Sequence, residues 1–149
     1  MGVHGLEFIP VPKLNMDIPD KSRLVIRAGS REIADQVIYC NSGDSRRKGL
    51  LGRRILAPNE GILMNMPGFR EGKSGIVNSI HMLGMRFDIA AAWLNFEGRI
   101  IYTVLARRWR LYYGTTHPSW YVLELHSSKL PLLTEETLLS WEIWSPNRI

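Results

Sequence analysis

Apolar and polar residues alternate in short runs along most of this chain, and turn-forming residues separate the runs. A period of two is typical of β-strands, because successive side chains of a strand point to opposite faces of its sheet. Alternating runs, or short apolar runs that fit a buried strand, occupy 23–27, 33–40, 61–66, 76–83, 85–96, 99–105, 120–126 and 140–144. The pattern therefore predicts a mainly β domain of about eight strands, folded as a β-sandwich or barrel.

The segment 85–105 is predicted to form a β-hairpin in the core of this domain. Glu97 and Gly98 are a tight-turn signal between its two strands. One face of the first strand is apolar throughout, whereas the other begins with Arg86 and Asp88 and becomes apolar from Ala90 onward. We therefore expect this strand to be central in its sheet, polar at one end and buried on both faces at the other.

The predicted helices are short and few. Asp44 stands at the position of an N-cap before a short helix that reaches Leu51, although Gly49 interrupts the helical run. The segment 134–139 is expected to form one further helical turn. Three prolines within the first 20 residues predict an extended N-terminal arm over 1–21, which leaves 22–149 as a single β-rich domain.

Composition narrows the class of protein further. Hydrophobic residues make up 45% and charged residues 22% of the 149 residues, so the chain is expected to bury one core. Cys40 is the single cysteine, which excludes an internal disulfide and a multi-cysteine metal site. The N-terminus has no basic start followed by an apolar run, and no stretch is apolar enough to span a bilayer. We expect a cytoplasmic protein without a membrane partner.

Positive charge is concentrated in the middle of the chain. The formal net charge is +5, but residues 21–110 contain 16 lysines and arginines against 7 acidic residues. A basic region favours an anionic partner such as nucleic acid, phosphate or acidic lipid, although exposed arginines also keep a small domain in solution. For a net charge of this size we favour the second interpretation, in which the arginines keep the domain in solution.

Four motifs, in this order and spacing, resemble the family known as domain of unknown function family 192. They are Arg46-x-x-Gly49-Leu50-Leu51, Glu60-Gly61-Ile62, SIHMLGMRFDIAAAWLNFEGRII from Ser79, and YVLEL from Tyr121. The resemblance covers roughly residues 22–145, and it implies a compact β-sandwich-like fold with short helices and no established activity. Family members have an acidic residue where this chain has Ala90, and Asp88 lies two positions earlier.

Four polar residues lie in apolar surroundings and are the candidate ligand-binding residues: Arg46, His81, Asp88 and Glu124. A charged group on a half-buried strand is costly unless it has a partner. Arg46 is therefore expected to pair with Asp88 or Glu124 as a structural clamp. Alternatively, His81, Asp88 and Glu124 line one pocket and bind a small polar or anionic ligand, or act there as the acid and base of a small enzyme.

A metal site is a weaker interpretation of the histidines. His117, Glu124 and His126 have suitable ligand atoms, but the chain contains no His-x-His pair of the kind that a cupin-like site uses. No Gly-x-Ser-x-Gly motif supports a serine nucleophile, and no glycine-rich phosphate-binding motif is present. We therefore assign no catalytic residue, no metal and no cofactor.

The segment 107–113 combines cations with aromatic rings. Bases can stack on rings while guanidinium groups contact phosphates, so this segment could bind nucleic acid. The residues concerned are Arg107, Arg108, Trp109, Arg110 and Tyr113, with Tyr112 beside them. The same residues could instead cap the sandwich, with the rings inward and the guanidinium groups in water, and this is the interpretation that we favour.

Taken together, these features favour a small binding or accessory module for a small polar or anionic ligand. A small enzyme that uses Asp88, Glu124 and His81 is the first alternative, and a nucleic-acid-binding module is the second. No motif in the sequence identifies the ligand or the oligomeric state.

Overall fold

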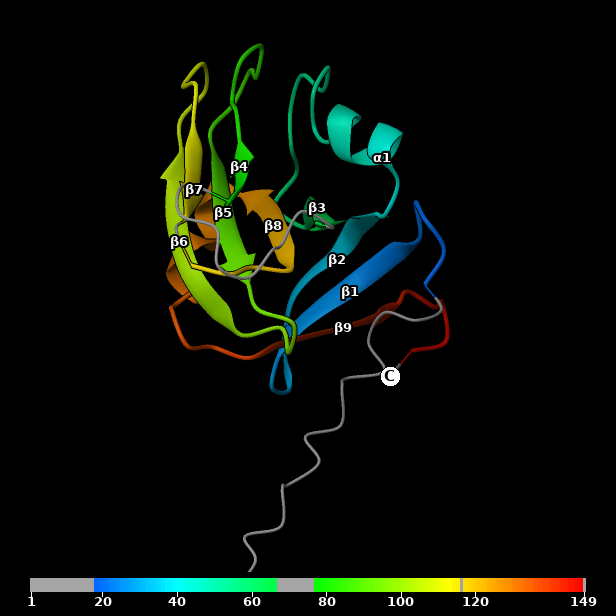
Figure 1. Ribbon diagram of the computed structural model, residues 1–149. Helices are drawn as coiled ribbons and strands as arrows, with labels where there is room; N and C mark the ends of the chain where they lie inside the picture. The colour runs from blue at the N-terminus through cyan, green and yellow to red at the C-terminus, as the bar shows by residue number, and fades with distance from the viewer. Residues whose placement is uncertain (1–17, 67–76, 116, 149) are drawn as a thin grey trace, which may run out of the picture.

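The computed structural model describes residues 18–66, 77–115 and 117–148. These segments contain nine strands, one short α-helix and one 3₁₀ helix (Figure 1). In chain order the elements are β1 (Arg23–Ala28), β2 (Arg31–Cys40), α1 (Gly43–Lys48), β3 (Glu60–Asn65), β4 (Val77–Ile80), β5 (Ile89–Leu94), β6 (Ile100–Ala106), β7 (Tyr113–Thr115), β8 (Tyr121–His126), η2 (Ser127–Leu132) and β9 (Leu139–Ile143). The prediction of a mainly β fold with short helices is confirmed.

Seven of these strands form one mixed sheet, in the order β6-β5-β8-β3-β2-β1-β9, and β4 pairs with β7 in a second, small sheet. The large sheet is curled, because Ile100 of β6 and Trp141 of β9, from its two opposite edges, belong to one buried cluster. An isolated bridge between Arg99 and Leu138 brings the two edges together at one end. The sheet does not close into a barrel along the rest of its length.

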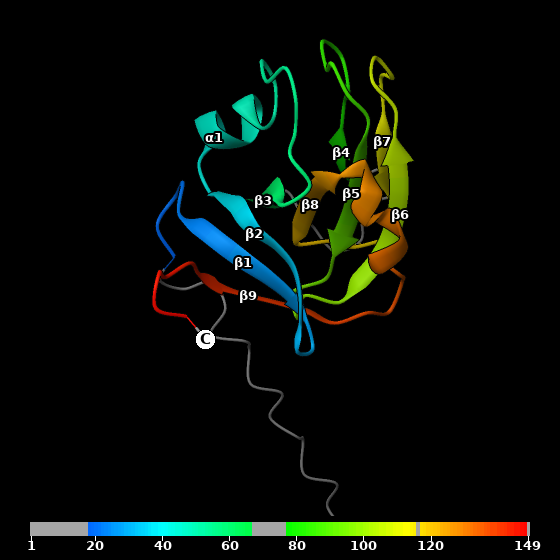
Figure 2. The same ribbon diagram turned by 180° about the vertical axis from the view of Figure 1, so that it is seen from behind.

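Both faces of the large sheet are buried at its central strands, β3, β5 and β8. Alternate residues of β5 enter two different clusters: Ala90, Ala92 and Leu94 belong to the cluster inside the curl, and Ile89, Ala91 and Trp93 to the cluster on the outer face. We call the second of these the outer core. It contains Cys40, Leu50, Leu56, Ile62, Met64, Ile80, Met82, Met85, Ile89, Ala91, Trp93, Ala106 and Val122. The region around α1 and the small β4-β7 sheet cover this face (Figures 1 and 2).

The predicted core hairpin is confirmed, with a shorter first strand. β5 and β6 pair antiparallel from Ile89 opposite Ala106 to Leu94 opposite Ile100, and the Asn95 side chain accepts hydrogen bonds from the amides of Glu97 and Arg99 in the turn. The four residues 85–88, expected to begin the strand, instead belong to the loop between β4 and β5. β5 itself is buried along its whole length, as expected for a central strand.

The short helix α1 begins and ends near the predicted positions, but its N-cap is Ser42 and not Asp44. The Ser42 hydroxyl accepts a hydrogen bond from the amide of Ser45 at 3.1 Å, and the Ser45 hydroxyl accepts one from the amide of Ser42. Such a reciprocal capping box satisfies two amides that the helix leaves free. The prediction of a helical turn over 134–139 is wrong, because the helical turn lies earlier, in η2, and Leu139 already begins a strand.

Residues 1–17 of the predicted N-terminal arm lie outside the described residues. The described residues before β1 are fixed to the domain: the Lys21 amide donates to the carbonyl of Tyr39 at 2.7 Å, and the Asn41 amide donates to Asp20 Oδ1 at 2.7 Å. Among the described segments, no helix is long and apolar enough to cross a membrane.

Candidate functional site

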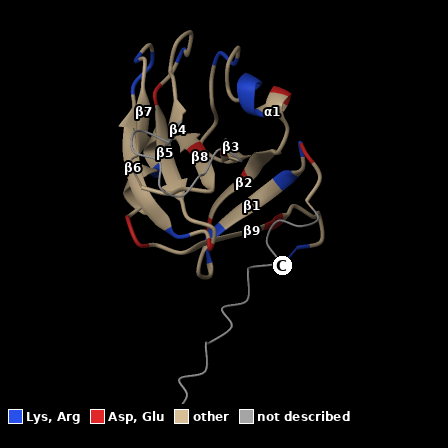
Figure 3. Ribbon diagram, in the orientation of Figure 1, with Lys and Arg blue, Asp and Glu red and all other residues tan. Residues whose placement is uncertain are grey.

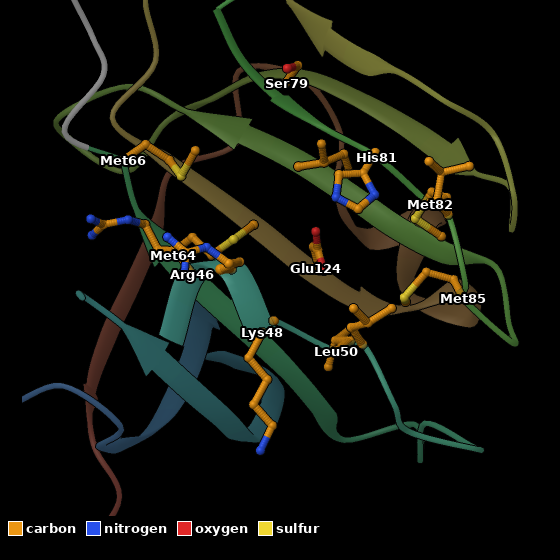
Figure 4. Close-up of a pocket in the computed structure, with 15 residues that line it drawn as sticks. Arg46, Lys48, Leu50, Met64, Met66, Ser79, His81, Met82, Met85 and Glu124 are labelled. Atoms are coloured by element: carbon orange, nitrogen blue, oxygen red, sulfur yellow. The ribbon is translucent and has the colours of Figure 1, made fainter. Parts of the chain in front are cut away.

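A pocket of about 280 Å³ lies on the outer face of the large sheet, between α1 and the chain around His81 (Figure 4). Strands β3 and β8 form its floor, and the segment that follows α1 forms part of its wall. Its lining is mainly apolar, with a few polar side chains. The lining residues are Arg46, Arg47, Lys48, Gly49, Leu50, Leu51, Met64, Met66, Ser79, Ile80, His81, Met82, Leu83, Met85 and Glu124.

Glu124 lies at the floor of this pocket, in the middle of β8. It is opposite Ile62 of β3 and Ala91 of β5, so its side chain leaves the sheet on the face of the outer core. Only 7% of the residue is exposed. Among the described residues, none forms a hydrogen bond or a salt bridge with its carboxyl group. Burial therefore raises the pKa of the Glu124 carboxyl from 4.5 to about 7.

Arg46 lines the same pocket from α1 but does not neutralise Glu124. Its guanidinium donates to the carbonyl oxygen of Asn65 at 3.1 Å, at the end of β3. Within the described segments it forms no salt bridge with Glu124 or Asp88, so the expected clamp is not formed. The physical reason is that α1 lies beside the end of β3, where the Asn65 carbonyl is within reach of the guanidinium.

His81 and four methionines complete the surroundings of Glu124. His81 directly follows β4, is exposed, and lines the pocket on the side opposite α1. The thioethers come from Met64, Met66, Met82 and Met85 (Figure 4). The sequence analysis did not identify these four methionines as site residues. The signal that could have found them is their spacing: Met64 and Met66 are two positions apart, and Met82 and Met85 are three positions apart. Thioether side chains are flexible and polarisable, so they adapt to different bound shapes.

Asp88 is the one predicted ligand-binding residue that the structure does not bring to the pocket. It precedes β5, and its Oδ1 accepts a hydrogen bond from the amide of Arg108 at 2.9 Å. Arg46, His81 and Glu124 thus share one cavity, whereas Asp88 fixes a loop. The predicted pocket that joins Asp88 to Glu124 and His81 is not assembled, and neither is the enzyme site built from these three residues.

The two histidines considered as metal ligands each have a local contact of their own. His117 Nδ1 lies 3.4 Å from the Thr115 hydroxyl, and His126 Nδ1 accepts a hydrogen bond from the amide of Ser128 at the start of η2. In the part of the chain that the structure describes, no group of three His, Cys, Asp or Glu side chains is placed to hold a metal ion.

The segment 107–113 does not cap the sandwich in the way that we favoured from the sequence. Trp109 is 65% and Tyr112 70% exposed, so two of its three rings face away from the core. Tyr113 is half-buried, and its hydroxyl accepts a hydrogen bond from the amide of Arg107 at 2.9 Å. The cap interpretation is wrong for Trp109 and Tyr112, because the chain leaves the large sheet at Ala106 and none of the described elements covers these two rings.

Residues 24–131 match the model of domain of unknown function family 192, described as an uncharacterized ACR. The chain belongs to this family. The predicted resemblance is confirmed: the match includes all four motifs and covers most of residues 22–145. No curated protein matches this member of family 192.

Two solved structures have the same fold as this member of family 192. A proposed transcription regulator from Sinorhizobium meliloti 1021 is 20% identical, with a TM-score of 0.62 over 85% of this chain and 97% of that one. A protein of unknown function from Novosphingobium aromaticivorans DSM 12444 is 15% identical, with a TM-score of 0.61 over 82% and 84% of the two chains. At these identities the likeness concerns the fold alone.

Proposed function

We propose that this domain is a binding module whose pocket takes a small molecule with an apolar body and a nitrogen that donates hydrogen bonds to Glu124. The observation that carries the proposal is the buried Glu124 carboxyl, which has no partner among the described residues. A buried carboxyl without a partner destabilises a fold, and a ligand with an N–H donor would remove that cost when it binds.

The size and the lining of the pocket agree with such a ligand. A volume of about 280 Å³ is near the lower end of the range found for small-molecule sites, so a ligand larger than a few rings would not be enclosed. The walls offer apolar contacts through Leu50, Ile80 and the methionines. A small number of polar groups in a mainly apolar cavity is the usual arrangement for orienting a ligand.

The cations at the mouth suggest how a polar or anionic substituent would be accommodated. Arg46, Arg47 and Lys48 follow one another on α1 and all line the pocket. Figure 4 shows Arg46 and Lys48 extending from α1 away from Glu124, which lies at the floor of the cavity. A ligand whose N–H end meets Glu124 and whose anionic end reaches out of the cavity toward α1 would therefore contact groups of both charges.

A comparison of two probes of similar shape tests the proposal. Phenethylamine carries a cationic nitrogen on a phenyl body, and 3-phenylpropionate carries a carboxylate on a similar body. At about pH 8 we expect phenethylamine, but not 3-phenylpropionate, to raise the unfolding temperature at millimolar concentration. Glu124→Gln should abolish this effect, and Glu135→Gln, a change at an exposed position, should preserve it.

Two results would contradict the proposal. One is an equal response to the amine and the carboxylate. The other is a response to the amine that survives in Glu124→Gln, because the amine would then bind elsewhere.

Proton transfer is a second candidate function, favoured by the pKa of Glu124. A carboxyl with a pKa of about 7 exchanges protons near neutral pH, which is what a general acid or base requires. His81 lines the same cavity. Hydrolysis of p-nitrophenyl acetate, measured against pH, should then show an inflection near pH 7 that Glu124→Gln removes. A rate equal to that of buffer alone would exclude this activity on the ester.

A reducing compartment such as the cytoplasm suits this domain, because the Cys40 thiol is free and buried. Fractionation of cells that produce the tagged full-length chain would test this location.

A further inference from the structure

The large hydrophobic side chains that are exposed gather at one end of the molecule. In the described segments ten such residues are exposed, and six of them lie on three neighbouring stretches of chain. We call these stretches, residues 43–59, 81–88 and 107–112, the loop end. Its exposed hydrophobic residues are Leu51, Ile55, Leu83, Trp109, Leu111 and Tyr112.

The three stretches form one continuous surface. The Trp109 amide donates to the carbonyl of Met82 at 2.7 Å, and the Met82 amide donates to the carbonyl of Arg110 at 2.8 Å. A Cβ atom placed on Gly84 would lie 3.3 Å from Cδ1 of Leu51, so the first and second stretches also touch. Figures 1 and 2 show all three at the same end, opposite the turn between β1 and β2.

This end is also the most positively charged part of the domain. The three stretches contain nine lysines and arginines and two acidic residues, a formal charge of +7 against +5 for the entire chain. Both acidic residues already have a partner: Asp44 lies 3.7 Å from Arg47, and Asp88 accepts the amide of Arg108. Figure 3 shows the basic residues on the loops and on α1 at this end.

The loop that carries most of the exposed rings is held in place without being covered. Trp109 has a φ of 70°, which is uncommon for a residue other than glycine, and its side chain is 65% exposed. Hydrogen bonds to Met82, Asp88 and the Tyr113 hydroxyl fix the backbone on either side. The rings are therefore presented to the outside by an ordered backbone, which lowers the entropy lost on docking.

We propose that the loop end docks on an anionic membrane surface. Trp and Tyr side chains favour the level of the lipid headgroups, and aliphatic side chains favour the acyl boundary beneath it. Arginines around them attract acidic headgroups. This proposal does not rest on the proposed function of the pocket, and it differs from our expectation from the sequence that no membrane partner exists.

A membrane explains more of this surface than nucleic acid does. Stacking with bases would use Trp109 and Tyr112, but it gives no role to the exposed aliphatic side chains beside them. Those side chains are Leu51, Ile55, Leu83 and Leu111. They lie on the three stretches of the loop end, and Leu51 and Leu83 also line the pocket. A flat lipid surface can contact several of them at once.

Sedimentation with vesicles tests the proposal on the full chain. We expect the protein to bind phosphatidylcholine vesicles that contain about 30% phosphatidylserine at physiological salt, and not vesicles of phosphatidylcholine alone. Leu111→Ala should weaken binding about tenfold. Its matched control is Leu138→Ala, which should leave binding unchanged. Leu138 is 48% exposed, close to the 61% of Leu111, but it lies outside the loop end, where the edges of the large sheet carrying β6 and β9 meet.

A second pair of variants tests the role of charge. Arg110→Gln should weaken binding about fivefold, whereas Arg31→Gln, at the turn between β1 and β2, should leave it unchanged. Circular dichroism and unfolding temperatures should confirm that all four variants are folded.

Three outcomes would overturn the proposal. The first is no sedimentation with the anionic vesicles. The second is an equal loss of binding in Leu111→Ala and Leu138→Ala, which would show that the loop end has no special role. The third is that the protein does not bind the vesicles but binds a single-stranded RNA oligonucleotide, and that Arg110→Gln weakens this RNA binding. This outcome would assign the surface to nucleic acid.

Discussion

The buried carboxyl of Glu124 makes the stability of this domain depend on pH in a way that one substitution can isolate. Glu124→Gln keeps the shape of the side chain and removes its charge. The pKa of this carboxyl rises from 4.5 to about 7 on folding, because burial disfavours the ionised form. The folded chain therefore binds this proton more tightly than the unfolded chain does.

The sign and size of the effect follow from this difference. Ionised Glu124 destabilises the fold fully above about pH 7, by about 3 kcal/mol at about 1.4 kcal/mol for each pKa unit. The destabilisation decreases as the pH falls through 7 and is absent well below 4.5, where the carboxyl is neutral in both states. Between about pH 5 and about pH 8, wild type should lose about 2.5 kcal/mol of unfolding free energy relative to Glu124→Gln.

Urea unfolding followed by tryptophan fluorescence measures this quantity at both pH values. The glutamine amide has a hydrogen-bonding cost of its own, but that cost does not depend on pH and cancels in the comparison. Other titrating groups are shared by the two proteins and cancel as well. A difference between the two proteins that is the same at both pH values would refute the reasoning, because Glu124 would then ionise in the folded chain as it does in water.

Three further predictions concern the fold around the site. Gly61→Ala should lower the free energy of unfolding by about 3 kcal/mol or abolish soluble expression, because the added Cβ would overlap the carbonyl oxygen of Glu124. Gly43→Ala is the control, since its Cβ would have no atom within 4 Å, and it should be neutral or slightly stabilising. Urea unfolding measures both variants. Burial raises the pKa of the Cys40 thiol to about 11, so Ellman's reagent at about pH 8 should label it only after denaturation. Ser42→Ala should destabilise the domain by about 1 kcal/mol, measured by chemical unfolding, through loss of the N-cap.

The pocket and the loop end share ten residues, and two of these are exposed large hydrophobic residues. Leu51 and Leu83 line the pocket and are also exposed at the loop end. The stability of Glu124 variants reports on the pocket floor, and vesicle binding by Leu111 variants reports on the loop tips. The two sets of experiments therefore examine different parts of the domain.

Local sequence determined most of the strands of this protein. Period-two alternation and the Glu97-Gly98 turn were sufficient for the β5-β6 hairpin, because pairing between neighbouring segments depends on local side-chain patterns. The order of strands was not predictable in this way. β2 and β3 pair in parallel across α1, and β5 lies between β6 and β8, which is decided by packing among distant segments.

The candidate site shows the same division. Alternation along β8 correctly separated Glu124 from Leu123 and Leu125, since neighbouring residues of a strand face opposite sides. The sequence could not show that the side facing Glu124 is also buried, because the covering comes from α1 and β4, which are distant in the chain. Tertiary packing therefore converted one acidic residue of a strand into an unpaired carboxyl at the floor of a pocket, and it left Asp88 outside.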